Sequence, residues 1–244
     1  MSANPATVGS DREFSLGGVK FGREVAVVAL AAAVLPVLNH YFNPSAALIP
    51  YLPWLQHIRA GYLIYAFDIV LLYLPLPILA ALLLLRRGPA DYGMRLGDWR
   101  RGLRWTLLYC LVATAVLLAV VAVTEVGPYY RGFFYAPGRM PALRDHLALI
   151  AVNLALMFAW EFLWRGFTLF GLGRHIGPGP AILLQAVPFT ILHFGKPFIE
   201  TLASPLLGIV YGIVSWRTGS FYYAVLMHLY TFVLTNFLAV GLLG

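Results

Sequence analysis

The chain has 244 residues, of which 61% are hydrophobic and 11% are charged, and its formal net charge is +7. Soluble domains carry about 25% charged residues, so this composition excludes an ordinary soluble domain and indicates a polytopic membrane protein. The positive charge does not indicate a nucleic-acid partner, because the basic residues cluster at the ends of predicted helices as topology signals do. The single cysteine, Cys110, lies within a predicted span and excludes an intrachain disulfide.

Long apolar runs predict an all-α membrane bundle of about seven transmembrane helices. They are separated by polar, glycine-rich and proline-rich stretches of the kind that mark loops. Pro75 and Pro77 should bend or break the second span. The expected spans cover about residues 24–42, 61–85, 103–126 and 147–172, then a segment that ends near 194, then 198–216 and 221–243.

Three regions divide the chain. Residues 1–22 are polar and are expected to form a mobile tail. Residues 23–143 hold the first three spans, a basic interfacial segment at 91–101 and a loop over 127–145. Residues 144–244 hold the remaining spans and most of the unusual polar residues within apolar runs.

Charge predicts the orientation in the membrane. The strongest basic cluster runs from Arg86 to Arg104 and is expected to face the cytoplasm. With an odd number of spans the termini lie on opposite sides, so we expect a multi-pass cell-membrane protein with a cytoplasmic N-terminus. Arg59, Arg131, Arg139, Arg144 and Lys196 then fall on the outer side.

Glu161 and Arg165 are the most costly residues within the apolar runs. They are four residues apart, so they share one helix face and can form an ion pair. Charged groups at this depth face the protein interior and are often functional. Two interpretations stay open: a structural pair that fixes helix packing, and a general base oriented by its arginine.

Two histidines lie in later apolar runs, His193 and His228. At about 1.5 Å of rise per helical residue, both fall near mid-membrane together with Glu161. A lone buried histidine is usually structural, but agreement in depth favours one shared site. Histidine can orient a water molecule, donate to an oxyanion or bind a metal.

Further polar residues surround these positions. Glu200 follows a predicted turn and should return to nearly the depth of His193, where it could orient that histidine or simply pair with Lys196. Thr231 lies on the same helix face as His228, and Asn236 is close to that face, as supporting groups or as interhelical hydrogen-bonding residues. Asp68 has no evident partner.

The ordered motifs resemble those of the CPBP intramembrane proteases, the CAAX-protease and bacteriocin-processing family. The matching pieces cover about residues 145–240: Glu161 with Arg165 and the following glycine, Phe189 with His193, Arg217-Thr218-Gly219-Ser220, and His228. The basic stretch at 91–101 also looks like the segment that often precedes that core. The resemblance implies a glutamate-dependent, metal-independent peptidase that cleaves a membrane-embedded or lipid-anchored peptide or protein.

The chain departs from this family at two positions. Trp160 stands where the family has the first of two glutamates, and Phe232 stands where it has Asn or Asp after the last histidine. The predicted site therefore has Glu161, His193, His228 and Glu200 as catalytic residues, with Arg165, Thr231 and Asn236 in support. Glu161, or Glu200 in its place, would activate water with His193, and His228 would stabilise the oxyanion.

Three alternatives stay open beside the peptidase. A zinc ion held by Glu161, His193 and His228 would leave the fourth position free for water. A non-catalytic scaffold, or a protein that binds a peptide or lipid, would explain Trp160 and Phe232. A transporter is disfavoured because about seven spans show no internal repeat.

Overall fold

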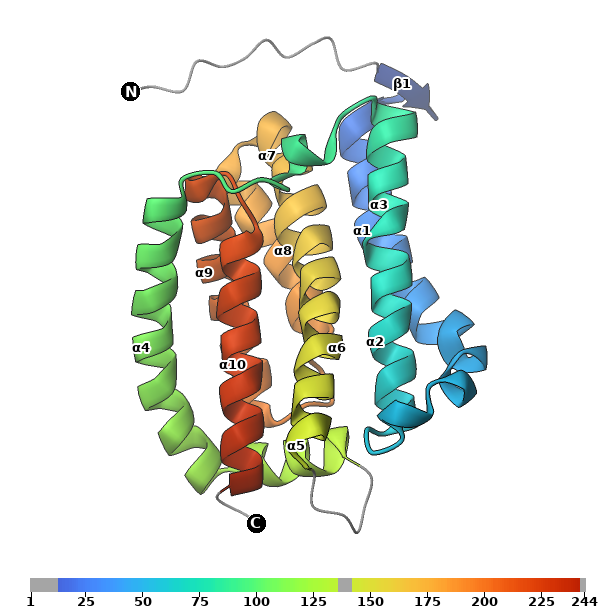
Figure 1. Cartoon of the computed structure of the whole chain (residues 1–244). Coiled ribbons are helices and arrows are strands. Elements are labelled where there is room, and N and C mark those ends of the chain that lie inside the picture. Colours follow the sequence, from blue (N-terminus) through green and yellow to red (C-terminus); the bar gives the residue numbers. More distant parts are fainter. Residues whose placement is uncertain (1–12, 136–141, 242–244) are drawn as a thin grey trace.

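A computed structural model describes residues 13–135 and 142–241 of the chain. The helices run up and down in one bundle (Figure 1). α1 (Arg23–Tyr41) begins at one end of this bundle and α10 (Tyr222–Gly241) finishes at the other. This arrangement agrees with an odd number of crossings.

Among the described residues, six helices are long and apolar enough to cross a membrane, and a seventh apolar helix, α8 (Pro178–Ile191), is shorter. The predicted all-α polytopic bundle of about seven spans is therefore confirmed. The spanning helices are α1, α2 to η4 (Ala60–Leu85), α4 (Trp99–Val123), α6 to α7 (Leu143–Ile176), α9 (Phe198–Thr218) and α10.

The second span is interrupted where the prolines predict. α2 (Ala60–Tyr73) ends before Leu74, α3 (Pro75–Leu79) continues the path, and the π-helix η4 (Ala80–Leu85) completes it. A proline ring removes a backbone donor and clashes with the preceding turn, which explains the break. Before this span, the connection from α1 contains three short 3₁₀ turns: η1 (Pro44–Ala47), η2 (Ile49–Tyr51) and η3 (Pro53–Leu55).

Two predictions about the connections are wrong. Within the expected mobile tail, β1 (Glu13–Leu16) and β2 (Val19–Gly22) pair as an antiparallel hairpin. Two consecutive glycines with positive φ provide its turn, as such hairpins require. Within the expected loop 127–145, α5 (Val126–Phe134) forms a short amphipathic helix, while residues 1–12 and 136–141, including Arg139, lie outside the described residues.

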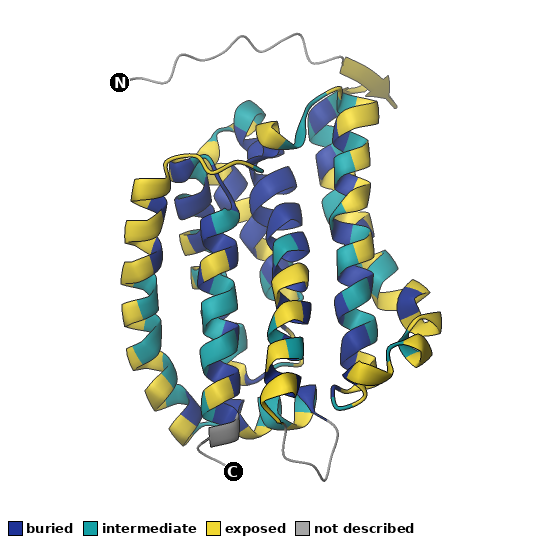
Figure 2. Ribbon diagram, in the orientation of Figure 1, coloured by how far each residue is buried: buried dark blue, intermediate teal, exposed yellow. Residues whose placement is uncertain are grey.

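Burial separates the lipid-facing surface from the core. Figure 2 shows exposed residues along the outer side of α4. Leu107, Leu111 and Val123 of this helix are 69%, 72% and 80% exposed. Such large apolar surface has no place in water and suits contact with lipid chains. By contrast, the segment from α6 through η6 (Phe162–Thr168) to α7 (Leu169–Ile176) is the most buried of the spans.

The basic segment before α4 is fastened to the turn between α9 and α10. η5 (Pro89–Tyr92) opens this segment. Nε of Arg95 donates to the carbonyl oxygen of Gly219 at 3.0 Å, and the Tyr223 hydroxyl donates to the Leu96 carbonyl at 2.7 Å. Gly219 and Gly97 both have positive φ, and a Cβ on Gly97 would lie 2.0 Å from the Thr218 oxygen. The two stretches that carry the family resemblance are thus one packed unit.

α8 and α9 are held close by small residues and one amide. Nε2 of Gln185 donates to the carbonyl oxygens of Ile182 and Gly208 at 2.8 and 2.9 Å. A Cβ on Gly208 would lie 3.1 Å from that of Ala186, which is closer than an ordinary van der Waals contact, so the glycine permits the close approach of the two helices. Small residues permit such close packing between membrane helices. This packing positions the turn between α8 and α9, which carries His193.

Candidate active site

Glu161 and Arg165 form an ion pair in the fully buried centre of the bundle. Nη1 of Arg165 lies 3.2 and 3.1 Å from the two carboxylate oxygens of Glu161, and both side chains are 0% exposed. Arg165 belongs to the π-helix η6, which starts directly after Glu161. π-turns inside α-helices occur frequently at functional sites. The guanidinium also lies 4.0 Å from the ring centroid of Phe189, so cation–π attraction adds to the pairing.

The glycine after Arg165 has a packing role. A Cβ on Gly166 would lie 2.8 Å from the Phe162 ring and 2.9 Å from the backbone oxygen of Tyr92. The glycine therefore allows η5 to approach the π-helix. This contact explains why the motif places a glycine next to the arginine.

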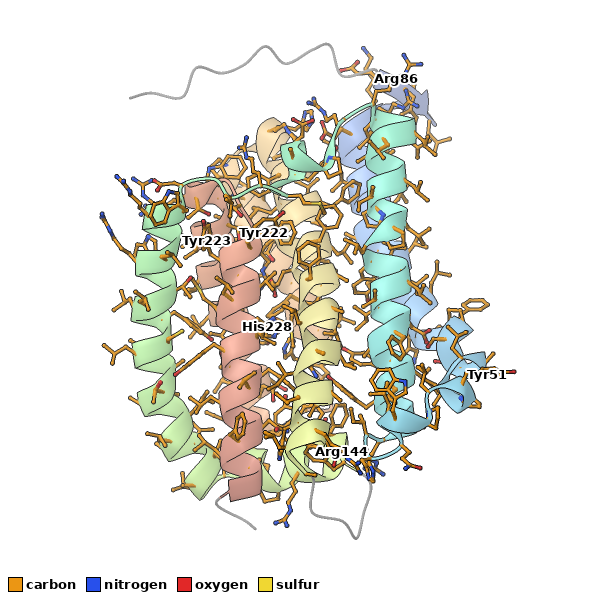
Figure 3. All side chains as sticks on the ribbon, in the orientation of Figure 1. Tyr51, Arg86, Arg144, Tyr222, Tyr223 and His228 are labelled. Atoms are coloured by element: carbon orange, nitrogen blue, oxygen red, sulfur yellow. The ribbon has the colours of Figure 1, made fainter. Side chains whose placement is uncertain are left out.

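His228 joins this pair from α10. Its Nδ1 lies 2.7 Å from Oε1 of Glu161. Because a carboxylate can only accept, Nδ1–H is the donor, and Nε2 is the acceptor of the neutral ring. Figure 3 shows His228 midway along α10. The Glu161 carboxylate is thus shared by Arg165 and His228.

His193 lies just beyond the end of α8, in the turn that leads to α9. Its Nδ1 is 2.7 Å from the carbonyl oxygen of Phe189, so Nδ1–H donates and Nε2 is left as an acceptor. The Phe189 ring lies between the histidines, 4.6 Å from the His193 ring and 6.2 Å from the His228 ring. The predicted fifth span ran through His193. The helix instead ends at Ile191, and in the turn that follows it His193 is buried while Phe194 is exposed.

A cavity of about 430 Å³ brings the two histidines to a common surface. Both His193 and His228 line it, together with apolar residues of α4 and aromatic residues of α5. Its size and largely apolar lining suit a ligand with a long hydrophobic part. Glu161 is not part of the lining and is connected to the cavity through His228.

Glu200 lines the same cavity but binds other partners than predicted. Its carboxylate accepts from Nζ of Lys196 at 2.9 Å and from the Tyr130 hydroxyl at 2.5 Å. Burial and the nearby Glu200 carboxylate raise the pKa of Tyr130 well above its usual value, so the phenol stays protonated and donates. Within the described ranges, no hydrogen bond or ion pair joins Glu200 to His193. The structure thus shows the alternative pairing with Lys196.

The two predicted supporting residues of α10 lie in different surroundings. Thr231 lines the cavity and its hydroxyl is 2.6 Å from that of Tyr109. Asn236 instead contacts the Tyr135 hydroxyl and Nδ1 of His146, at 3.2 and 3.1 Å. It therefore lies apart from the histidine pair. Asn236 and Thr231 are five residues apart, which is about one and a half helical turns, so their side chains point in different directions from α10. The prediction that Asn236 lies close to the face of His228 therefore did not place it at the site.

Aromatic side chains occupy the two positions that depart from the family pattern. Trp160 is buried against Tyr73 and lies with its ring centroid 6.5 Å from that of His193. Phe232 packs edge-on against Phe134 of α5 at 5.1 Å. Both also line the cavity. They make these two parts of the cavity wall apolar.

Several polar contacts of the described residues had no signal in the sequence. The hydroxyls of Tyr109 and Tyr211 lie 2.7 Å apart on the cavity wall, from helices α4 and α9. Both tyrosines look like ordinary aromatic residues in apolar runs. Asp68, left unassigned above, accepts from the backbone N–H of Ser45 at 2.8 Å and so fixes the loop after α1.

No group of three or more His, Cys, Asp and Glu side chains among residues 13–135 and 142–241 is arranged to hold a metal ion. Glu161 and His228 contact each other directly, while the Nδ1–H of His193 is directed at a backbone carbonyl. The proposed zinc ligands are thus not gathered as one cluster.

Comparison with known proteins gives one match. Residues 142–234 match the family described as type II CAAX prenyl endopeptidase Rce1-like. This part of the chain is similar to that family. The match agrees with the resemblance to the CPBP proteases and supports a CAAX-type membrane protease at the level of the family. The matched region holds Glu161, Arg165, His193 and His228, and spans less than half of the 244 residues. Searches of curated proteins and of solved structures found no match to the chain.

Proposed function

We propose that this protein is an intramembrane endopeptidase in which Glu161 and His228 act as a unit. The observation that carries this proposal is the 2.7 Å contact between Nδ1 of His228 and Oε1 of Glu161 beside the cavity. Because Glu161 is fully buried and His228 lines the cavity, the histidine is the group that meets the water. Glu161 orients the ring and balances the charge that the ring acquires.

The reaction is hydrolysis of one peptide bond. Nε2 of His228 takes a proton from water, and the oxygen of that water bonds to the scissile carbonyl carbon. The proton on His228 then passes to the leaving nitrogen as the C–N bond breaks. Nε2 of His193 is an acceptor and holds the second hydrogen of the water. Sequence reasoning assigned proton removal to Glu161 itself and the oxyanion to His228, and the burial of Glu161 favours the exchange of these roles.

The remaining charged groups have other roles in this proposal. Arg165 holds the Glu161 carboxylate in position, because its Nη1 contacts both carboxylate oxygens. Glu200 and Lys196 form an ion pair on the cavity wall, where they give the cavity one strongly polar edge. Asn236, bonded to Tyr135 and His146, supports the packing of α10 and does not act on substrate.

The substrate is a membrane-embedded or lipid-anchored peptide. The apolar cavity accommodates a hydrophobic group, and the matched family is described as a CAAX prenyl endopeptidase. The lipid bilayer surrounds the bundle, with the N-terminus in the cytoplasm. No cofactor takes part, and zinc bound by Glu161, His193 and His228 is the alternative.

The test is cleavage of a farnesylated CAAX peptide by the purified protein in detergent or liposomes. Wild type should release the terminal tripeptide, and Glu161→Ala and His228→Gln should not. His228→Gln leaves the Glu161–Arg165 pair in place, so its fold should be retained. Activity that is lost on chelation and restored by zinc supports the metal alternative. Failure of wild type to cleave prenylated or unprenylated peptides, while binding them, supports the non-catalytic alternative.

A further inference from the structure

We infer that Tyr211 donates a hydrogen bond to the oxyanion formed during peptide cleavage, and that Tyr109 and Thr231 orient it. This inference rests on the proposed function. If His228 removes the proton from water, another group must stabilise the negative charge on the carbonyl oxygen. The family's Asn or Asp position is Phe232 here and cannot donate.

Three hydroxyls form a chain on the cavity wall. The Tyr109 hydroxyl lies 2.7 Å from that of Tyr211 and 2.6 Å from that of Thr231, and the Thr231 hydroxyl is 3.1 Å from the Met227 carbonyl. The three residues come from α4, α9 and α10, and all line the cavity with the two histidines. The chain of hydroxyls therefore belongs to the site and not to the lipid-facing surface.

Each hydroxyl has one proton, so the chain can run in only two directions. In one direction Tyr211 donates to Tyr109, Tyr109 to Thr231, and Thr231 to the Met227 carbonyl. In the other, Thr231 donates to Tyr109 and Tyr109 donates to Tyr211. The proton of Tyr211 is then free for an acceptor in the cavity. The Met227 carbonyl loses little, because a helix carbonyl already accepts from the backbone four residues on.

The surroundings of Tyr211 favour donation. Its ring centroid lies 5.6 Å from that of His228, which places it beside the group that activates water. The Arg165 guanidinium lies 5.3 Å from the same ring. A cation near the π-face draws electron density from a phenol and makes its O–H a stronger donor. A substrate oxyanion thus selects the second direction of the chain, at little cost in reorganisation.

Tyr230 provides a matched control. Its hydroxyl lies 2.5 Å from that of Thr114 and so links α10 to α4, as Tyr109 links α4 to α10. Tyr230 does not line the cavity. Tyr230→Phe therefore removes one phenol and one hydrogen bond between the same helices without touching the proposed site.

The experiment compares two uncleavable farnesylated peptides in competition with a farnesylated CAAX substrate. One has a phosphinate at the scissile bond, which imitates the oxyanion, and the other has a methylene-amine, which lacks that oxygen. Wild type should prefer the phosphinate by about 10²-fold or more. Tyr211→Phe should lose most of that preference and about 10²-fold in kcat with little change in KM. Tyr109→Phe should lose less, and Tyr230→Phe should match wild type.

The outcomes separate this inference from the proposed function. If wild type cleaves and Tyr211→Phe keeps the phosphinate preference and kcat, Tyr211 is not the donor and only this inference is overturned. If Tyr109→Phe loses as much as Tyr211→Phe, the hydroxyls act as a proton relay and the inference as stated is also overturned. If wild type neither cleaves the substrate nor prefers the phosphinate, the proposed function fails and this inference with it.

Discussion

Glu161 is held between Arg165, from its own helix one turn on, and His228 of α10, whose Nδ1 lies 2.7 Å from its Oε1. The histidine is separated from Glu161 by 67 residues and is the one member of the set that lines the cavity. This geometry connects the buried carboxylate to the cavity through the His228 ring, as the proposed mechanism requires.

The buried ion pair should control stability. Glu161→Gln leaves the Arg165 charge buried without its counter-ion, and we expect a loss of about 3–5 kcal/mol in the free energy of unfolding. The double variant Glu161→Gln with Arg165→Met removes both charges and should be more stable than Glu161→Gln alone. Thermal unfolding in detergent measures both. Equal stability of Glu161→Gln and wild type would show that water reaches and screens this pair.

Glu161 and His228 should act as one unit in cleavage. His228→Gln alone should lower kcat by about 10³-fold or more, and adding Glu161→Gln should lower it little further, because residues of one catalytic unit are not additive. The measurement is cleavage of the farnesylated peptide by single and double variants that remain folded. Independent, multiplicative losses would assign separate roles to the two residues.

His193 should contribute to chemistry more than to folding. Its ring donates one hydrogen bond to the Phe189 carbonyl, which already lies at the end of α8. We expect His193→Ala to stay folded, with a thermal midpoint close to that of wild type, and to be inactive. The exposed His40 provides the control, since His40→Ala should be fully active. Retained cleavage by a folded His193→Ala would make this histidine structural.

Substitution of Glu200 tests whether His228 or Glu200 is the general base. We expect Glu200→Gln to lower activity by about tenfold, much less than His228→Gln, because the amide oxygen can still accept from Tyr130 while the ion pair with Lys196 is lost. Lys196→Gln breaks the same ion pair from the other side and should have a similar effect. If Glu200→Gln is inactive and Lys196→Gln is not, the Glu200 carboxylate is itself the base.

The contact between the basic segment and the α9–α10 turn should be intolerant of a side chain at Gly97. Gly97→Ala would combine a left-handed backbone, at φ of 57°, with a Cβ 2.0 Å from the Thr218 oxygen. We expect a loss well above the roughly 1–2 kcal/mol of the backbone strain alone. Gly17→Ala would have a similar φ of 58° with no atom within 4 Å of the new Cβ, so it isolates the backbone strain. Equal unfolding temperatures for the two variants would contradict the close packing.

Composition and apolar periodicity determined the class of fold and the path of the chain. The cost of exposing polar backbone to lipid favours a helix for each apolar run, so about seven spans could be predicted from sequence. Among the described residues, six of these are long helices and the fifth is a shorter one. The same cost marked Glu161, Arg165 and His228 as interior residues. Connections were less predictable: the hairpin of residues 13–22 and α5 depend on turn geometry and on packing against the bundle.

Only the tertiary structure decided which polar groups meet. Spacing along one helix indicated the Glu161–Arg165 pair, but His228 reaches Glu161 across the bundle, and Glu200 binds Lys196 and Tyr130 rather than His193. Tyr109 and Tyr211, whose hydroxyls are in contact, are 102 residues apart in the chain and belong to different helices. In the sequence these tyrosines cannot be distinguished from core aromatic residues. The physical reason is that apolar periodicity fixes which face of a helix turns inward, whereas the partner it meets depends on crossing angles and helix lengths set by packing.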